Sequence, residues 1–486
     1  MRAGPGGLFS RIEIVYNHYL RQKKVGRSFH PESGRRQGTA MKTILVLGAG
    51  LSSSTLIRYL LDHSCEFGWK IVLGDISHEL ASRKINKHPN GEAVQFNAHD
   101  PAQSAALIQK ADVVISMLPA AMHSLVARSC IEHRAHLITA SYVSDEIRAL
   151  DEQAKAGGLL FLSEVGVDPG IDHMSAMRII DRIKAQGGKI RAFESSTGGL
   201  VAPENDNNPW NYKFTWNPRN VVVAGQGVSR FLHNGRIKYI PYHRLFNRTE
   251  TVEIQDIGKF EIYPNRDSLK YRDIYGLEGV QTLFRGTMRR LGYSQAWDVF
   301  VQLGMTDDSY VIENSEGMTY REFVDSYLPY EKNIPIEAKL AKYLKIAEDS
   351  GIMAKLKWSG IFERTKIGLK RATPAQILQN LIEPKWKLAP EEKDMIVMYH
   401  LLEYEIDDIQ KRLVSTLVVK GTDQEHTAMA ITVGLPVAIA AKLLLTGRIS
   451  AVGIQLPISR EIYEPVLAEL EEYGVRFVEE ETLIAG

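Results

Sequence analysis

Acidic and phenolic side chains follow two apolar runs of the chain, where they could move protons on a bound substrate. Asp168 lies in "SEVGVDPGIDHM" (residues 163–174) and Tyr142 in "TASYVS" (residues 139–144), each after an apolar run. If both runs are strands of one parallel sheet, both residues lie beyond the carboxyl ends, where such sheets bind ligands. A carboxylate there can accept a proton, and a phenol can donate a hydrogen bond or share that proton. We therefore predict that Asp168 and Tyr142 are catalytic, whereas Asp172 is better explained as a helix cap.

The stretch "ILVLGAGLSSS" (residues 44–54) has the spacing of a nucleotide-binding turn but lacks its third glycine. An apolar strand precedes it and an amphipathic helix follows, which is the context that this motif requires. Gly48 would make the tight turn, and Gly50 would let the backbone approach a pyrophosphate at the helix N-terminus. Ser53 stands at the third position, where close packing is the main demand, and Ser52, Ser53 and Ser54 can donate hydrogen bonds to phosphate. The stretch predicts a dinucleotide site; the alternative is a turn that binds nothing.

Asp75 ends the next apolar run, "WKIVLGD", about 25 residues after the glycine turn. An acid at this position accepts hydrogen bonds from the adenosine ribose and repels a 2′-phosphate. The sequence therefore favours NAD as the cofactor, with NADP as the alternative that Arg83 and Lys84 could restore. Asp75 could instead only cap the helix that follows.

A long polar and aromatic segment, "STGGLVAPENDNNPWNYKFTWNPRNV" (residues 196–221), stands in the middle of the chain. Its composition is unlike that of a core element, and long loops of this kind are usually functional; the alternative is a rigid connector. Arg266, Arg285 and Arg289 follow near predicted turns. Clustered guanidinium groups suit a substrate with several carboxylates, although each arginine alone is more typical of a surface charge.

The apolar runs that carry these residues alternate with helical patterns. From Met41 to about residue 170, this alternation predicts a Rossmann-type doubly wound parallel sheet. Further on, residues 295–415 are predicted to be mostly helical. The predicted strands of a second, mainly antiparallel sheet are "KIRAFESSTGG", "VVVAGQG", "TVEIQDIG" and "KFEIYPN". "RLVSTLVVKG" is predicted to be a further strand.

The composition is that of an ordinary globular protein with more than one domain. The chain has 486 residues, 44% of them hydrophobic, and a formal net charge of +1, so charge gives no reason to expect nucleic-acid or membrane binding. Cys65 and Cys130 cannot build a disulfide framework, which favours a reducing, cytoplasmic location. The fourteen histidines show no metal-binding spacing, and we predict no metal. The apolar run at 427–445 contains Pro436 and Lys442 and is expected to be a buried helix.

Four segments together resemble the glutamate-forming saccharopine dehydrogenase family: "VGVDPGIDHM", "GGLVAPENDNNPWNYKFTWNPR", "YPNRDS" and "RGTMRRLGY". The resemblance covers the chain from Met41 to its end. It implies an α/β fold with a Rossmann domain, an inserted α+β substrate and dimerisation domain, and a homodimer. The expected domains are a disordered or non-native extension over 1–40, the dinucleotide-binding domain over 41–170, the substrate domain with a helical subregion over 171–425, and a segment over 426–486 that packs back on the Rossmann domain.

The resemblance also implies the site residues. The implied cofactor contacts are Gly48, Gly50, Leu51, Ser52, Ser53, Asp75, Ile76, Asn97, Ala98, Met117, Leu118, Val167, Asp168, Pro169 and Asn217. The implied substrate contacts are Ala140, Ser141, Asp168, Arg266, Thr287, Met288 and Arg289.

The family's reaction is the reversible oxidation of saccharopine at its secondary amine, which yields L-glutamate and 2-aminoadipate 6-semialdehyde. The resemblance thus implies an enzyme of lysine metabolism, and Asp75 favours the oxidative, degradative direction. One alternative is a related reductive-amination enzyme that makes carboxynorspermidine, whose substrate has fewer carboxylates. Another is a Rossmann-fold scaffold without catalysis. No nucleic-acid or membrane partner is expected.

Overall fold

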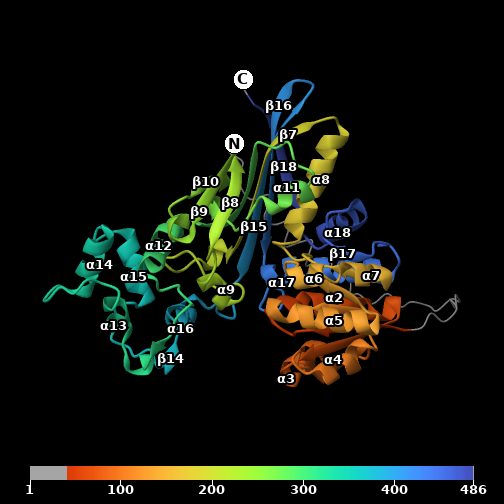
Figure 1. Cartoon of the computed structure of the whole chain (residues 1–486), viewed down its shortest axis with the longest axis horizontal. Helices are drawn as coiled ribbons and strands as arrows, with labels where there is room; N and C mark the ends of the chain where they lie inside the picture. The colour runs from red at the N-terminus through yellow and green to blue at the C-terminus, as the bar shows by residue number, and fades with distance from the viewer. Residues whose placement is uncertain (1–40, 485–486) are drawn as a thin grey trace, which may run out of the picture. The chain divides into compact units, whose positions relative to one another are not determined.

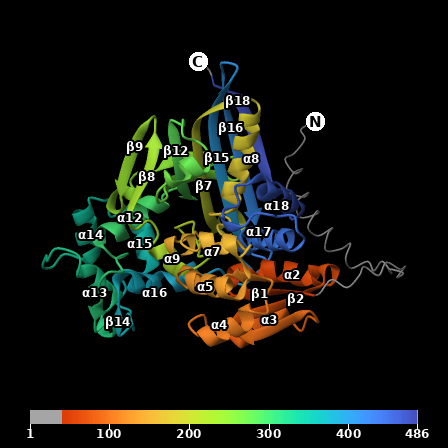
Figure 2. The same ribbon diagram turned by 45° about the vertical axis from the view of Figure 1, so that its right-hand side comes forward.

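The computed structural model describes residues 41–484, which form two compact units (Figures 1 and 2). The first unit ends at Arg178 and resumes over Ala430–Phe477; the second comprises Ile179–Met429 and the described residues from Val478 onward. The predicted extension over residues 1–40 lies outside the described residues. The four domain ranges expected from the sequence stay a prediction.

The first unit is built on a seven-stranded sheet in the order β17-β6-β5-β4-β1-β2-β3, and every adjacent pair runs parallel. β1 (Lys42–Leu47) is fully buried over its last four residues, as a strand covered on both faces should be. This sheet, with its helices, confirms the predicted Rossmann-type fold. The other strands are β2 (Trp69–Asp75), β3 (Gly91–Gln95), β4 (Val113–Ser116), β5 (His136–Thr139), β6 (Leu160–Leu162) and β17 (Gly453–Gln455).

Helices follow most of these strands, and polar side chains cap the N-termini of two of them. Ser77 begins α3 by accepting a hydrogen bond from Leu80 N (3.2 Å), and Asp100 begins α4 by accepting one from Gln103 N (3.1 Å). The helices are α2 (Ser54–Phe67), α3 (His78–Ile85), α4 (Pro101–Ile108), α5 (His123–His133), α6 (Asp145–Arg148), α7 (Asp151–Ala156) and α18 (Arg460–Glu472). α8 (Ile171–Ala185) and α17 (Ala428–Leu445) each contain a boundary between the units.

The second unit is built on a nine-stranded sheet whose main path is β10-β11-β12-β7-β15-β16-β18, with β8 and β9 attached at β12. Only β12 and β7 are parallel among the pairs with a described register, so the predicted mainly antiparallel sheet is confirmed. Figure 2 shows β7, β15 and β16 side by side. The strands are β7 (Lys189–Val201), β8 (Val228–His233), β9 (Arg236–Pro241), β10 (Glu250–Ile254), β11 (Gly258–Pro264), β12 (Thr282–Arg290), β15 (Asp394–Ile406), β16 (Ile409–Lys420) and β18 (Phe477–Leu483).

Two sequence assignments in this unit are wrong. The predicted strand "VVVAGQG" is the end of helix α9 (Pro218–Val222) and a turn, because Asn217 Oδ1 caps Arg219 N at 2.9 Å and Pro218 occupies the first helical position. The stretch expected to be mostly helical contains β15, whose continuous apolar run has no helical period. The helices of the unit are α10 (Tyr242–Leu245), α11 (Lys270–Ile274), α12 (Tyr293–Leu303), α13 (Tyr320–Asp325), α14 (Ile336–Leu344), α15 (Gly351–Ser359) and α16 (Pro374–Trp386).

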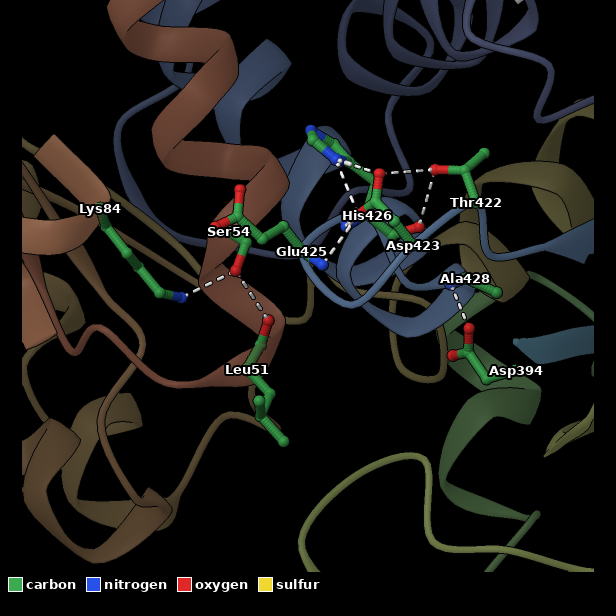
Figure 3. Close-up of polar contacts among 9 residues, drawn as sticks. All are labelled: Leu51, Ser54, Lys84, Asp394, Thr422, Asp423, Glu425, His426 and Ala428. Carbon is green, nitrogen blue, oxygen red and sulfur yellow. Dashed lines mark hydrogen bonds and ion pairs between the residues drawn. The ribbon is translucent and has the colours of Figure 1, made fainter. Parts of the chain in front are cut away.

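The apolar stretch near the C-terminus forms α17, as predicted. Among residues 41–484 it is the one helix long and apolar enough to cross a membrane, and 78% of it is buried. Asp394 lies at its start and accepts a hydrogen bond from Ala428 N at 2.6 Å (Figure 3). It also accepts one from Met429 N at 2.9 Å. Burial raises the pKa of the Asp394 carboxyl, and these two donors oppose the rise.

The aromatic residues of the segment 196–221 belong to the core, which corrects the expectation that its composition is unlike a core element. Trp210 and Tyr212 are 0% exposed. The Trp210 ring stacks on Phe300 with centroids 5.7 Å apart, and its Nε1 donates to Lys355 O at 3.0 Å. An indole whose N–H is satisfied can be fully buried, so the polar neighbours of Trp210 gave a misleading signal.

We expect Trp210→Ala to lower the free energy of unfolding by about 3–5 kcal/mol, because it leaves a cavity among stacked rings. Urea denaturation followed by circular dichroism measures this loss. Tyr330→Ala is the matched control, because Tyr330 is 87% exposed and surface changes usually stay within about 0.5 kcal/mol. Equal small effects of the two substitutions would contradict the assignment of Trp210 to the core.

Candidate functional site

The glycine turn has the geometry of a phosphate-binding turn. Gly48 has a φ of +104°, and a Cβ there would lie 2.8 Å from Met117 O, so no other residue fits without strain. Gly50 has no atom within 4 Å of its Cβ position, which leaves the backbone open to a ligand. The hydroxyl of Ser53, at the position of the missing glycine, is buried and donates to Gly50 O at 2.8 Å. Ser53 therefore completes the turn internally, and its hydroxyl is committed to the turn rather than to phosphate.

A lysine on the neighbouring helix α3 joins this turn. Lys84 Nζ donates to Ser54 Oγ at 2.8 Å, and Ser54 Oγ donates to Leu51 O at 3.4 Å (Figure 3). Lys84 Nζ also donates to Gly50 O. The ammonium group therefore lies at the positive N-terminal end of α2. Two positive contributions at one place favour an anion, such as a phosphate group.

α17 packs directly behind the same turn. A Cβ on Gly434 would lie 3.1 Å from Ser52 O and 3.0 Å from Leu56 N. Sequence reasoning did not single out Gly434, since a glycine within an apolar helix carries no motif. Its role follows only from the close approach of the two helices.

The ends of the central strands gather the other predicted cofactor residues in the first unit. Asp75 accepts hydrogen bonds from Ala49 N (2.7 Å) and Ser77 N (2.8 Å). The cap of the following helix is Ser77, so Asp75 does not serve as that cap. Leu51 and Ile76 are 70% and 66% exposed, an apolar surface suited to a nucleoside. The rest of this set, Asn97, Ala98, Met117 and Leu118, follows β3 and β4.

The structure brings the two predicted catalytic residues together. Tyr142 Oη donates to Asp168 Oδ1 at 3.2 Å. The two residues follow β5 and β6, which are adjacent parallel strands, and both side chains are partly exposed. Val167 and Pro169 flank Asp168, and the Asp168–Pro169 peptide bond is cis. Asp172 is the second residue of α8, and its Oδ1 accepts from Gly170 N at 2.6 Å, so this carboxylate holds the turn before the helix.

The hydroxyl of Ser141 is held by a buried histidine, His123, that sequence reasoning missed. Ser141 directly follows Ala140, the other predicted substrate contact at this strand end. His123 Nε2 lies 2.7 Å from Ser141 Oγ, and His123 Nδ1 lies 2.8 Å from Ser116 Oγ. Burial lowers the pKa of His123 to about 4, so the ring is neutral near pH 7. Its position at the start of α5, the helix that follows β4, was the available signal.

In the second unit, Arg289 lies in a cage of tyrosine rings. Its guanidinium carbon lies 4.9 Å from the ring centroid of Tyr212, 5.4 Å from that of Tyr293 and 5.9 Å from that of Tyr263. The side chain is 4% exposed, and its Nε has no hydrogen-bond partner among the described residues. A buried guanidinium with an unused donor is suited to bind an anionic group.

Thr287 and Met288 precede Arg289 on β12. In the parallel register, Thr287 lies beside Thr197 of β7, whose buried Oγ1 has no hydrogen-bond partner among residues 41–484. Thr197 is a second residue that sequence reasoning missed, because a lone threonine in a strand gives no signal. Together these residues place polar groups next to Arg289.

The remaining predicted residues of this unit are Arg266, Arg285 and Asn217, and each lies in a different environment. Arg266 is exposed with a φ of +52° in the loop after β11. Arg285 is 5% exposed and lies 4.4 Å over the ring of Tyr271, and Asn217 caps α9. Arg285 is therefore a core residue rather than a free surface charge.

The residues of the first unit fit a nicotinamide dinucleotide. The tight turn at Gly48, the open backbone at Gly50, the N-terminus of α2 and the exposed apolar side chains beside Asp75 are each what such a group requires. The Tyr142–Asp168 pair lies at the same edge of the sheet. The arrangement can hold the dinucleotide and move a proton beside it.

Comparisons with known proteins agree with this geometry. Two family models match the chain: "Saccharopine dehydrogenase NADP binding domain" over residues 44–162 and "Saccharopine dehydrogenase C-terminal domain" over residues 166–475. The chain is similar to saccharopine dehydrogenase (NADP(+), L-glutamate-forming) of Pyricularia oryzae, with 32% identity over 90% of this chain and 98% of that one. A solved structure of apo saccharopine dehydrogenase (L-Glu forming) from Saccharomyces cerevisiae has a TM-score of 0.82 at 30% identity, covering 91% of this chain and 100% of that one.

A mammalian relative is longer. The chain is 34% identical to the mitochondrial alpha-aminoadipic semialdehyde synthase of Mus musculus, over 91% of this chain and 48% of that protein. The chain thus spans about half the length of the mammalian relatives that it matches.

The lowered pKa of His123 predicts a specific pH dependence of stability. Since the folded protein binds this proton more weakly than the unfolded chain, the stabilisation is complete above pH ~6.5 and falls as the pH drops towards 4. One such group contributes a slope of about 1.4 kcal/mol per pH unit within this window. In urea denaturation across pH 4–7, we expect His123→Gln to flatten the slope by this amount.

The control for this measurement is His99→Gln, because His99 is exposed. It should leave the slope as in the parent protein. An unchanged slope in His123→Gln would contradict a neutral buried His123.

Proposed function

The chain belongs to the saccharopine dehydrogenase family, and on this premise we propose that it oxidises saccharopine at the secondary amine. The products are L-glutamate and 2-aminoadipate 6-semialdehyde, and the reaction is reversible. The observation that carries the proposal is the Tyr142–Asp168 hydrogen bond of 3.2 Å at the strand ends beside a dinucleotide turn. The degradative direction, a homodimer and a cytoplasmic location stay predictions from the sequence.

Asp168 is the proposed base. The secondary amine of saccharopine must be unprotonated when the adjacent carbon loses a hydride, and a bound dinucleotide supplies the hydride acceptor. Asp168 takes the amine proton. Tyr142 donates a hydrogen bond to the same carboxylate, which places the phenol oxygen beside the amine and so orients it. Asp168 returns the amine proton to solvent and then takes a proton from the water molecule that adds to the C=N carbon. Cleavage of the C–N bond in the adduct, with protonation of the leaving nitrogen, gives the amino acid and the aldehyde.

Arginines and hydroxyl groups are the proposed ligands of the substrate's carboxylates. Saccharopine carries three carboxylates, which guanidinium groups bind in a bidentate manner. Arg289 supports this role through its unused Nε donor, and Thr287 lies two residues away on the same strand. Arg266 supports it by its exposure. In the first unit, Ser141 is the proposed hydroxyl ligand, with His123 fixing its orientation.

NADP is the proposed cofactor, with NAD as the alternative. The name of the matching family model and the names of the fungal relatives contain NADP, and they do not support the NAD preference expected from Asp75. Lys84 supports NADP by adding positive charge at the turn. Asp75 opposes it, because its carboxylate repels a 2′-phosphate. The preference for NADP over NAD should therefore be narrow.

The direct test is an absorbance assay of the purified chain with saccharopine and NADP, then NAD. We expect reduction of the dinucleotide and release of L-glutamate. Activity with carboxynorspermidine but not with saccharopine would replace the proposed substrate, and no activity with either would favour a non-catalytic protein.

Asp75→Asn should raise the ratio of kcat/KM for NADP to that for NAD by about tenfold, since it removes a charge repulsion worth about 1.4 kcal/mol.

Asp168→Asn tests the proposed base. We expect kcat to fall by about 10²–10⁴, because the amide cannot accept the proton, while the dissociation constant of the dinucleotide changes far less. Steady-state kinetics and fluorescence titration measure the two quantities. Asp145→Asn, at an exposed position on α6, is the control and should keep full activity. Near-normal turnover of Asp168→Asn would remove Asp168 from the mechanism.

A further inference from the structure

A buried glutamate lies between the two chain segments that carry Tyr142 and Asp168. Glu164 follows β6 and is 3% exposed. Its Oε1 accepts a hydrogen bond from Val143 N at 3.1 Å, and its Oε2 lies 2.9 Å from Nε2 of His173, which is 0% exposed. Its backbone N–H also donates to Ser141 O at 3.0 Å. One residue thus makes three contacts across the site.

The backbone of Glu164 is strained for its residue type. Its φ is +62°, a region in which a non-glycine residue costs roughly 1–2 kcal/mol. Glycine or asparagine would occupy this position more easily. A glutamate at such a position needs compensation, and the two contacts of its carboxylate provide it.

These contacts lead to both proposed catalytic residues. Val143 follows Tyr142 directly, so its N–H fixes the peptide that places the phenol. On the other side, His173 lies in the first turn of α8, and its neighbour Asp172 holds Gly170 N at 2.6 Å. Gly170 closes the turn that begins at Asp168. The carboxylate of Glu164 therefore connects the two backbone segments whose separation sets the Tyr142–Asp168 distance.

We propose that Glu164 is a positioning residue for the reaction, holding the Tyr142 hydroxyl against the Asp168 carboxylate. The role rests on the proposed function, because it acts through Tyr142 and Asp168. Glu164 itself is buried behind the pair and acts on the substrate only through them. Loss of its carboxylate should therefore lower kcat much more than it raises KM, since a misplaced pair reacts poorly in a bound complex.

The test uses variants that separate the side chain from the backbone strain. Glu164→Gly removes the carboxylate and relieves the strained φ, and Glu164→Asn tolerates the φ but is too short to bridge Val143 and His173. Glu164→Gln can still accept from Val143 N and donate to His173 Nε2. Arg134→Gly is the matched control, because Arg134 has a φ of +57° and an exposed side chain in the same unit.

We expect kcat with saccharopine to fall by about 10–100-fold in Glu164→Gly and Glu164→Asn. Glu164→Gln should stay within about threefold of the parent protein, and Arg134→Gly should match it. Combining either variant with Tyr142→Phe should give a loss close to that of Tyr142→Phe alone, because residues that act through one contact are not additive. Circular dichroism and thermal unfolding show whether Glu164→Gly and Glu164→Asn are folded, and the comparison uses the folded variant.

Each result separates this inference from the proposed function. If the parent protein does not turn over saccharopine, the proposed function fails and the role of Glu164 fails with it. If the parent is active, and the folded Glu164 variant keeps normal kcat or loses activity in full addition to Tyr142→Phe, the positioning role is overturned and the proposed function stands.

Discussion

The parallel pairing of strands in the first unit is the constraint on which its site depends. Parallel strands of one sheet end at a common edge, so residues far apart in the sequence become neighbours. Gly48, Asp75, Met117, Ser141 and Asp168 lie at or beyond the ends of five different strands. Their backbone groups continue the pairing past the strand ends: Gly48 N donates to Gly74 O at 2.8 Å, and Met117 N donates to Leu47 O at 2.8 Å. The site is thus an extension of the hydrogen-bond ladder.

Several polar groups around this edge are used by other protein groups. Ser53, Asp75, His123 and Glu164 each hold a backbone or hydroxyl group of a neighbouring loop. In a site where one misplaced loop would separate the reacting groups, such contacts fix the geometry before any ligand binds. Arg289 in the second unit differs, because its Nε lies buried without a partner among the described residues.

The sequence predicted the parts of the protein that have local signals. The glycine turn, the alternation of strands and helices, the buried helix over α17 and the Tyr142–Asp168 pair all follow from residue order or strand ends. His123, Thr197 and Gly434 could not be found in this way, since their roles arise from contacts between elements. Trp210 was misjudged because its polar neighbours concealed an indole N–H that is satisfied inside the core. Glu164 did leave a signal that could have been followed, because it is an acid two residues after the buried strand β6.

Gly434 has a consequence for natural variation in this protein. It lies in the C-terminal quarter of the chain, far from the nucleotide motif, yet any larger residue there would press on Ser52 O and Leu56 N. A substitution at Gly434 would therefore crowd the start of α2, where the phosphates of the cofactor are proposed to bind, and would weaken cofactor binding without touching the motif. A map of the motif residues alone would classify it as a harmless change in a distant helix.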